Sequence, residues 1–266
     1  MLNDEQRFLF DTLGYIIVPD LLSAEQIEAL QSTLRISDEN SASVSQDEDP
    51  LHWGKIWRDI LDLPNLSPIL EDLIGNPMLR EARRVRGMLD LPTYRLDHIN
   101  VHTHVKKGYE GRPLHGGLPV AGSFKYHDGI FYNGLTVVSF ELFDTGSNHG
   151  GFACIPGTHK ANVALPEGWA DMSESVHDCV ARIAAKPGDA IIFTEALIHG
   201  SLPWNVDAPR RTVFYKFSPI TVSWAADFFN PIDFLHYDDM DDRKLAVLEP
   251  PNARYPDRST EPELRS

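Results

Sequence analysis

The sequence contains little cysteine, no long hydrophobic run and an opening segment without basic charge. Its 266 residues include two cysteines, Cys154 and Cys179, too few for a disulfide framework or for the paired cysteines of a zinc finger. No stretch reaches the roughly 20 consecutive apolar residues that a membrane helix requires. The first residues, MLNDEQ, are acidic and lack the basic and apolar regions of a secretory signal. These absences predict a cytoplasmic protein without a membrane segment.

Positive charge is also scarce. The sequence has 24 Lys and Arg against 39 Asp and Glu, a formal net charge of −15, and such a surface repels nucleic acid. The densest basic run, Arg80 to Arg86, is typical of a solvated helix end or loop. We therefore expect a small-molecule substrate, with no nucleic-acid polymer and no membrane as partners. The sequence predicts no particular oligomeric state.

Two acidic segments, Ser37 to Asp49 and Asp227 to Asp242, are candidate lids. The first combines serine, asparagine and acidic residues with few apolar ones, which is typical of a mobile loop. Loops that close over a substrate are drawn from such segments. The tail from Pro250 to Ser266 is rich in Pro, Arg and Glu and is predicted to be weakly ordered.

The first third of the chain has helical signals. A short helix is expected from Asp4 and ends at Gly14, before the β-rich run Tyr15 to Val18. Ser23 stands three residues before Gln26, which is the spacing of a capping box at the start of a second helix. A further helix is expected from Ser67 to Ile74.

From Tyr94 onward the pattern changes to short strands punctuated by turns. Such strands after N-terminal helices predict one mainly β domain over residues 1–266, with two β-sheets and flanking helices. Its core covers about residues 8–219, and residues 220–266 form a C-terminal extension. The expected strands are Arg95 to His102, Leu135 to Leu142, Gly151 to Ile155, Ala190 to Phe193 and Thr212 to Phe217.

Two histidines and an arginine in this β region suggest an iron site. His115 precedes two glycines, His199 follows the strand 190–193, and Arg210 lies eleven positions beyond His199. Imidazole suits iron, and a facial set of two histidines and one carboxylate leaves three positions for a 2-oxo acid and oxygen. Arginine suits the far carboxylate of that acid because it stays charged and binds bidentately. Ser201 stands two residues after His199, so in an extended chain it points to the same side.

The longest motif is GFACIPGTHK at residues 151–160. It resembles the Gly-x-x-x-x-Pro-Gly-Ser/Thr-His-Lys signature of the phytanoyl-CoA dioxygenase family, whose members depend on Fe(II) and 2-oxoglutarate. The segments KPGDA (186–190), HGS (199–201) and PRR (209–211) are similar to the rest of its C-terminal half. The opening GYIIVP (14–19) also resembles that family, so the resemblance covers roughly Phe8 to Pro219.

This resemblance implies a double-stranded β-helix, which is a jelly-roll or cupin-like core. It implies Fe(II), 2-oxoglutarate and O2 as cofactor and co-substrates. By the same resemblance, His115 and His199 bind the metal, and Arg210 and Ser201 hold 2-oxoglutarate. Phe140 falls where the family often has an aromatic residue beside the co-substrate.

The chain departs from the family pattern at Gly117. The family motif His-x-Asp/Glu would place a metal-binding carboxylate at this position, and glycine has no side chain. A few relatives with Gly or Ala there are halogenases. Loss of the carboxylate opens a coordination position that chloride can fill, so Gly117 is a candidate halide vacancy.

Three alternatives to this metal shell stay open. Asp128, in the pair His127-Asp128, could reach the iron from a loop. Glu195, four residues before His199, could approach the metal, although a hydrogen bond to a ligand or loop is the more common role for such a residue. His115 could also belong to a purely structural turn, since glycines mark tight backbone.

Three functions follow from these readings. The first is an Fe(II)/2-oxoglutarate-dependent halogenase that chlorinates a C–H bond of a small metabolite, with nucleosides or nucleotides, amino acids and alkaloids all open as substrates. The second is a hydroxylase of the same class whose shell is completed by Asp128, Glu195 or water. The third is an inactive binding module in which Gly117 marks decay.

Overall fold

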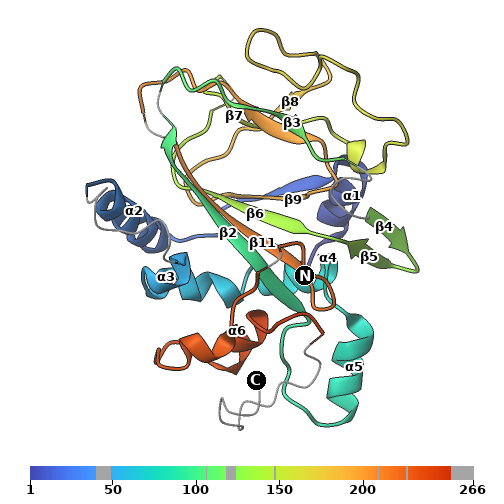
Figure 1. Cartoon of the computed structure of the whole chain (residues 1–266). Coiled ribbons are helices and arrows are strands. Elements are labelled where there is room, and N and C mark those ends of the chain that lie inside the picture. The colour runs from blue at the N-terminus through green and yellow to red at the C-terminus, as the bar shows by residue number, and fades with distance from the viewer. Residues whose placement is uncertain are drawn as a thin grey trace.

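Two antiparallel β-sheets stacked face to face form the centre of the molecule (Figure 1). The computed structural model describes residues 1–39, 49–105, 107–117, 124–146, 148–208, 210–225 and 227–252. The two sheets do not share a strand, so they form a two-layered sandwich rather than a closed barrel. This confirms the predicted mainly β, jelly-roll architecture.

The chain crosses between the two sheets several times. The larger sheet has the order β1 (Tyr15–Val18), β9 (Ala190–Thr194), β6 (Thr136–Glu141), β11 (Arg210–Pro219), β2 (Tyr94–Val105). The smaller sheet has the order β3 (Arg112–His115), β10 (His199–Leu202), β7 (Gly151–Cys154), β8 (Ala181–Arg182). A separate hairpin joins β4 (Phe124–His127) to β5 (Ile130–Asn133).

Helices cover the face of the larger sheet that is turned away from the smaller one (Figure 1). Burial of the apolar sides of most of these helices against this sheet forms the main hydrophobic core, whereas the helix at residues 77–85 contributes no side chain to it. The α-helices are α1 (Asp4–Leu13), α2 (Ala24–Glu39), α3 (Lys55–Asp59), α4 (Ser67–Leu73), α5 (Pro77–Val85) and α6 (Asp242–Val247). Short 3-10 turns are η1 (Pro50–His52), η2 (Ile60–Asp62), η3 (Thr158–Lys160) and η4 (Pro231–Phe234).

Local signals explain where the first helices begin and end. Gln26 N donates to Ser23 Oγ over 3.3 Å and Ser23 N donates to Gln26 Oε1 over 2.9 Å, which is the predicted capping box of α2. Gly14 closes α1 with φ of 83°, a left-handed conformation that glycine adopts without steric cost. The helices predicted from Asp4, Ser23 and Ser67 are therefore confirmed.

The alternation of side chains along β11 separates the core from the space between the sheets. Val213, Tyr215 and Phe217 point into the helix-covered core. Phe214 and Lys216 point to the opposite face, toward the smaller sheet. The same strand therefore supplies both the packing that holds the helices and the polar groups of the inter-sheet cavity.

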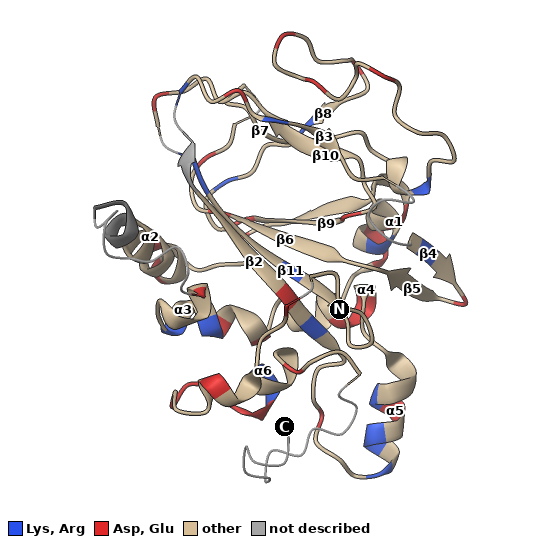
Figure 2. Cartoon of the chain, viewed as in Figure 1, with Lys and Arg blue, Asp and Glu red and all other residues tan. Residues whose placement is uncertain are grey.

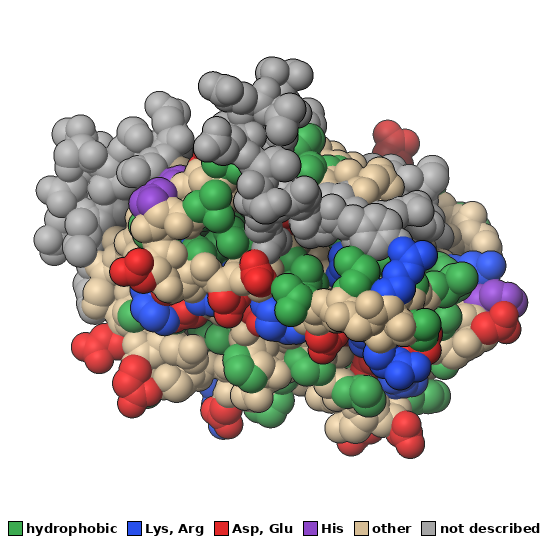
Figure 3. All heavy atoms as spheres, turned by 90° about the horizontal axis from the view of Figure 1, so that it is seen from below, with side chains coloured by type: hydrophobic (Ala, Val, Ile, Leu, Met, Phe, Trp, Pro, Cys, Tyr) green, Lys and Arg blue, Asp and Glu red, His purple; other side chains and the backbone are tan. Residues whose placement is uncertain are grey.

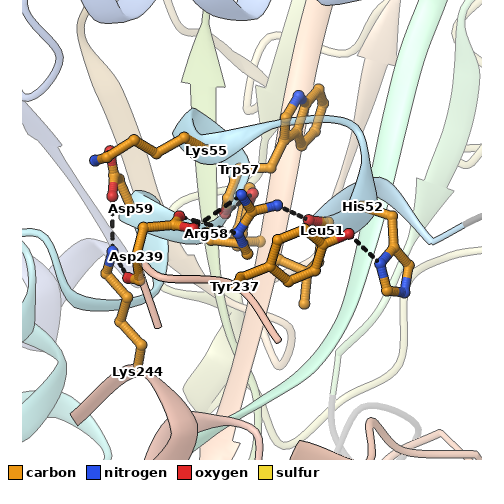
Figure 4. A network of polar contacts seen from close by, with 10 residues as sticks. Leu51, His52, Lys55, Trp57, Arg58, Asp59, Tyr237, Asp239 and Lys244 are labelled. Carbon is orange, nitrogen blue, oxygen red and sulfur yellow. Dashed lines mark hydrogen bonds and ion pairs between the residues drawn. The ribbon is translucent and has the colours of Figure 1, made fainter. Parts of the chain in front are cut away.

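A polar network fixes the C-terminal segment to α3 (Figure 4). Arg58 donates to both carboxylate oxygens of Asp239, with Nε–Oδ2 at 2.9 Å, and its Nη1 donates to the carbonyl of Leu51. The guanidinium also lies 3.7 Å from the ring centroid of Tyr237. Lys244, on α6, donates to Asp239 O and to Asp59.

The structure describes only part of the two acidic segments that were predicted to be candidate lids. Residues 37–39 belong to helix α2 rather than to a loop, and residues 40–48 lie outside the described part of the chain. Asp227 to Asp242 contains η4 and is anchored on α3. None of its described residues lines the cavity between the sheets. The structure therefore does not place it as a lid over that cavity.

Charged side chains of both signs are mixed over the surface (Figures 2 and 3). On α5, Arg84 forms an ion pair with Glu81, and Arg83 donates to the carbonyls of Leu91 and Pro92. The basic run therefore lies on a helix end as predicted, but Arg83 is buried, at 3% exposed, rather than solvated. Among the described residues, no helix is both long and apolar enough to cross a bilayer.

Candidate metal and co-substrate site

A cavity of about 300 Å³ lies between the two sheets. The apolar part of its wall comes from Val137, Phe152, Phe193 and Phe214. Its polar part comes from both sheets and from the turn between β9 and β10. These polar residues are Asn100, His102, Arg112, His115, Glu195, His199, Ser201, Arg210 and Lys216.

His115 and His199 meet in this cavity because β3 and β10 are neighbours. The two residues are register partners, and their ring centroids are 4.4 Å apart. The Nδ1 of His115 lies 2.9 Å from the carbonyl of Pro113, and the Nδ1 of His199 lies 2.8 Å from that of Leu197. A carbonyl only accepts, so each Nδ1 carries the hydrogen and each Nε2 keeps its lone pair for a metal.

His199 is buried and uncharged. Burial lowers its pKa to about 4, although the nearby carboxylate of Glu195 acts in the opposite direction. A neutral imidazole is the form that binds a metal ion. At neutral pH, His199 therefore needs to lose no proton before it can act as a ligand.

Glu195 follows β9 and lies in the turn that leads to His199. Its Oε1 accepts a hydrogen bond from Lys216 Nζ at 2.5 Å, and its Oε2 lies 3.7 Å from His199 Nε2. Burial raises the pKa of Glu195, but the positive charge and hydrogen bond of the Lys216 ammonium oppose burial, and that pKa lies below its ordinary value. Glu195 is therefore an ionised carboxylate beside the two histidines.

Arg210, at the start of β11, is 2% exposed and offers an unused donor. Its Nη2 lies 3.4 Å from Glu141 Oε1, but its buried Nε has no hydrogen-bond partner among the described residues. Gly151 lies against it, since a Cβ built there would be 3.4 Å from that Nε. Ser201 lines the same cavity. A buried guanidinium with an orphaned donor fits the carboxylate of a bound ligand.

Gly117 does not line the cavity. A Cβ built on it would lie 3.1 Å from Ile198 Cγ1, and the φ of Gly117 is +84°. Ile198 precedes His199 in the chain and packs with Leu114 and Met172 on the other face of the smaller sheet. A side chain at position 117 would therefore start toward that outer cluster, away from the face on which His199 meets Glu195.

Two further sequence-predicted residues also lie elsewhere. Phe140 points into the helix-covered core, where its ring centroid is 5.9 Å from that of Tyr215, so the structure does not bring it beside the co-substrate cavity. The reason is that side chains alternate between the two faces of a strand. Val137 faces the cavity, and Phe140, an odd number of positions further along β6, therefore faces the core. Asp128 lies exposed at the tip of the β4–β5 hairpin and pairs with His127. It does not line the cavity.

Lys216 and Arg112 are cavity residues that the sequence patterns did not single out. Lys216 stands six residues after Arg210, and the period of two along β11 puts both on one face. That alternation was the available signal. Arg112 had no comparable signal, because its position depends on how β3 pairs with β10.

The sequence profile of the family described as Phytanoyl-CoA dioxygenase (PhyH) matches residues 10–212. The chain belongs to the phytanoyl-CoA dioxygenase family. It is therefore an enzyme of the Fe(II)/2-oxoglutarate-dependent oxidoreductase class. A search of curated protein sequences found no match.

Solved structures support the fold. HygX from Streptomyces hygroscopicus, with nickel and 2-oxoglutarate bound, superposes with a TM-score of 0.68 at 21% identity, covering 84% of this chain and 89% of that one. The epimerase SnoN from nogalamycin biosynthesis gives a TM-score of 0.55 at 16% identity, covering 82% and 83%. AviO1 from Streptomyces viridochromogenes Tue57 gives 0.51 at 16% identity, covering 80% and 93%. At these identities the likeness shows a shared fold.

The residues of this cavity fit ferrous iron and 2-oxoglutarate, the two groups that the family implies. Two imidazoles whose Nδ1 atoms are hydrogen-bonded to carbonyls, together with one carboxylate, form a donor set suited to ferrous iron. The orphaned Nε of Arg210 suits the far carboxylate of 2-oxoglutarate. Within the described residues, no three His, Cys, Asp or Glu side chains are already gathered as a metal cluster. A three-ligand shell therefore requires a side-chain rotation.

Proposed function

We propose that this chain uses ferrous iron, 2-oxoglutarate and O2 to oxidise an unactivated C–H bond of a small metabolite. The observation that carries the proposal is the pair His115 and His199, whose Nε2 atoms are left free in one cavity by hydrogen bonds at Nδ1. Arg210 lines the same cavity with an unpaired donor. Position by position, these residues match the family motifs.

Each residue has a separate task in this proposal. His115 and His199 hold the iron, and Arg210 with Ser201 holds the far carboxylate of 2-oxoglutarate. When bound, iron and 2-oxoglutarate supply dioxygen activation coupled to oxidative decarboxylation. Glu141 lies against Arg210 and orients the guanidinium. The apolar side chains of Phe152 and Phe193 exclude water from His199, since both rings pack near its imidazole.

The cavity supports a small, polar substrate. Its volume of about 300 Å³ is at the lower end of the range for small-molecule sites. Arg112 is exposed and lines it, so an anionic or hydroxyl-rich group would meet a cation there. HygX has been solved with hygromycin B bound, and SnoN with nogalamycin RO, which supports a free metabolite as the substrate class.

Hydroxylation-type oxidation is the first candidate outcome, because Glu195 places an ionised carboxylate beside the metal-binding histidines. Chlorination is the second candidate. The observation that favours it is Gly117, which stands where the family motif has a carboxylate. The position of Gly117 outside the cavity lining weakens that support.

The C-terminal extension packs into the same hydrophobic core as the strands. We propose that residues 1–266 act as one oxygenase domain, because Phe234, Leu245 and Leu248 of the C-terminal extension pack into the same core as the strands. The free thiols of Cys154 and Cys179 support a cytoplasmic location. Preservation of both histidines and Arg210 in one cavity argues against a decayed binding module.

Anaerobic addition of Fe(II) and 2-oxoglutarate tests this function. The wild-type protein should develop a visible charge-transfer band, and oxygen should then convert 2-oxoglutarate to succinate. His115→Ala and His199→Ala should lose both signals, whereas His177→Ala, an exposed histidine outside the cavity, should keep them. Absence of the band and of metal uptake in the wild-type protein would refute the proposal. Added chloride separates the outcomes, because a chloride-dependent change in the wild-type band supports chlorination.

A further inference from the structure

The Glu195–His199 turn carries a carboxylate that the family motif does not include. Among the described residues that line the cavity, Glu195 is the single acidic one. It is 7% exposed, and its Oε2 lies 3.7 Å from His199 Nε2. A buried carboxylate is costly unless it is paired or binds a cation, and Lys216 pairs with its Oε1 and leaves Oε2 facing His199.

We propose that Glu195 supplies the carboxylate ligand to the metal held by His115 and His199, in place of the absent side chain at position 117. This inference rests on the proposed function and deepens it. The metal shell then has two imidazoles and one carboxylate, with the carboxylate arriving from the β9–β10 turn instead of from the end of β3.

The distances allow this assignment. Metal–nitrogen and metal–oxygen bonds at such sites are about 2.0–2.2 Å, so two ligand atoms on one ion lie about 3–4 Å apart. The separation of 3.7 Å between Glu195 Oε2 and His199 Nε2 falls in that range. Lys216 occupies Oε1, which leaves Oε2 free to bind in a monodentate manner. A rotation of the Glu195 side chain is required to bring its Oε2 to an ion shared by the two histidines.

Backbone hydrogen bonds position Glu195 in the β9–β10 turn, near His199. Its N–H donates to the carbonyl of Leu135 at 3.0 Å, and Leu197 N donates to the carbonyl of Thr194 at 2.9 Å. These bonds close a tight turn between the two sheets. The same turn continues into His199, so the carboxylate and the imidazole are positioned by one short, hydrogen-bonded segment.

The two glycines after His115 are explained by this turn. A Cβ on Gly116 would lie 2.6 Å from Leu197 O and 2.9 Å from Glu195 O, so only glycine lets the end of β3 pack onto the turn. Gly116 and Gly117 have φ of +90° and +84°, which also disfavour other residues. Glycine at position 117 is therefore required by backbone geometry, without any need for a halide vacancy.

Anaerobic titration with Co(II), followed by its visible spectrum, tests the assignment without turnover. Glu195→Ala and the isosteric Glu195→Gln should weaken Co(II) binding about tenfold or more, since loss of even an outer-shell partner costs about 10–100-fold. Glu71→Gln is the matched control, because Glu71 is a buried carboxylate that bonds Thr93 outside the cavity. It should keep wild-type Co(II) affinity.

Small anions provide the second part of the test. Acetate should restore Co(II) binding and its spectrum in Glu195→Ala, by filling the space that the side chain leaves. Chloride should perturb the Co(II) spectrum of Glu195→Ala more strongly than the wild-type spectrum, because the variant has one more open position on the metal. Circular dichroism establishes that both variants are folded, and Glu195→Gln keeps the shape of the side chain if Glu195→Ala does not fold.

Two results would overturn the inference. One is Co(II) affinity within twofold of wild type in Glu195→Gln, and the other is a chloride response of the Co(II) spectrum that is equal in the wild-type protein and in Glu195→Ala. Failure of the underlying function has a different signature, because the wild-type protein would then bind no Co(II), or binding would survive His115→Ala and His199→Ala.

Discussion

Arg210 and Glu141 face each other across the neighbouring strands β11 and β6, with Arg210 Nη2 3.4 Å from Glu141 Oε1. Both side chains are almost fully buried, at 2% and 1% exposed. Glu141 also accepts from Thr212 and Ser139, so its carboxylate is held from several directions. The guanidinium is thus fixed in orientation, while its Nε has no partner in the part of the chain that the structure describes.

This arrangement predicts the effect of Arg210→Lys on 2-oxoglutarate. Lysine keeps the charge but cannot form the two parallel hydrogen bonds of a guanidinium. We expect the dissociation constant for 2-oxoglutarate, measured by calorimetry on the Co(II)-loaded protein, to rise about tenfold. Co(II) binding itself should not change. Arg84→Lys on exposed α5 is the control and should leave both constants unchanged. An unaltered 2-oxoglutarate affinity in Arg210→Lys would remove Arg210 from the co-substrate site.

Gly117→Asp distinguishes a coordination vacancy from a backbone requirement. A non-glycine residue at a φ of +84°, with its Cβ 3.1 Å from Ile198, should lower the free energy of unfolding by about 1–3 kcal/mol. The new carboxylate should not tighten Co(II) binding, because it starts toward the outer cluster. Urea unfolding and Co(II) titration measure the two effects.

Gly108→Ala is a matched control for that variant. Gly108 has a φ of +87°, and a Cβ there meets no atom within 4 Å. Gly108→Ala should therefore lower the free energy of unfolding through backbone strain alone, and the loss should be somewhat smaller than in Gly117→Asp. A Gly117→Asp protein of wild-type stability with tighter Co(II) binding would show that position 117 does face the metal.

The ion pair between Arg58 and Asp239 predicts a large loss of stability. Arg58→Met leaves the carboxylate of Asp239 largely buried without its main partner, so the free energy of unfolding should fall by about 3 kcal/mol. Arg84→Met, which breaks the exposed pair with Glu81, should change it by less than about 1 kcal/mol. Chemical denaturation of both variants gives the comparison. Equal losses at the two sites would show that the Figure 4 network does not anchor the C-terminal segment.

Asp62 predicts a pH dependence of stability. Burial raises its pKa, but hydrogen bonds from Arg243 and Ser67 outweigh this and leave the pKa below its ordinary value. A carboxyl group with a lowered folded-state pKa contributes stability above its unfolded pKa of about 3.9, and that contribution disappears as pH falls through the folded value. Asp62→Asn should therefore be less stable than wild type at pH 7.

The pH series gives the decisive comparison. The difference in free energy of unfolding between wild type and Asp62→Asn should persist from pH 7 down to about pH 4 and shrink below it. Urea unfolding at several pH values measures it. A difference that stays constant to pH 3 would contradict a role for the ionised carboxylate.

Much of this fold could be predicted from local pattern. The capping box at Ser23, the glycine stop at Gly14 and the alternation in Thr212 to Phe217 depend on near neighbours in the chain, and each is present in the structure. Strand parity was harder to use. The period of two in β6 shows that Val137 and Phe140 face opposite ways, but it does not say which of them faces the cavity.

The sequence by itself determined the family, several of the strands and the identity of two histidines and one arginine, because motif spacing and side-chain alternation are local properties. Tertiary structure alone decided that a side chain at position 117 would start toward Ile198. It also decided that one carboxylate oxygen of Glu195 lies beside His199 and the other accepts from Lys216. Both arrangements arise where the β9–β10 turn, which connects the two sheets, packs against the end of β3. Their geometry depends on sheet packing, which no spacing along the chain encodes.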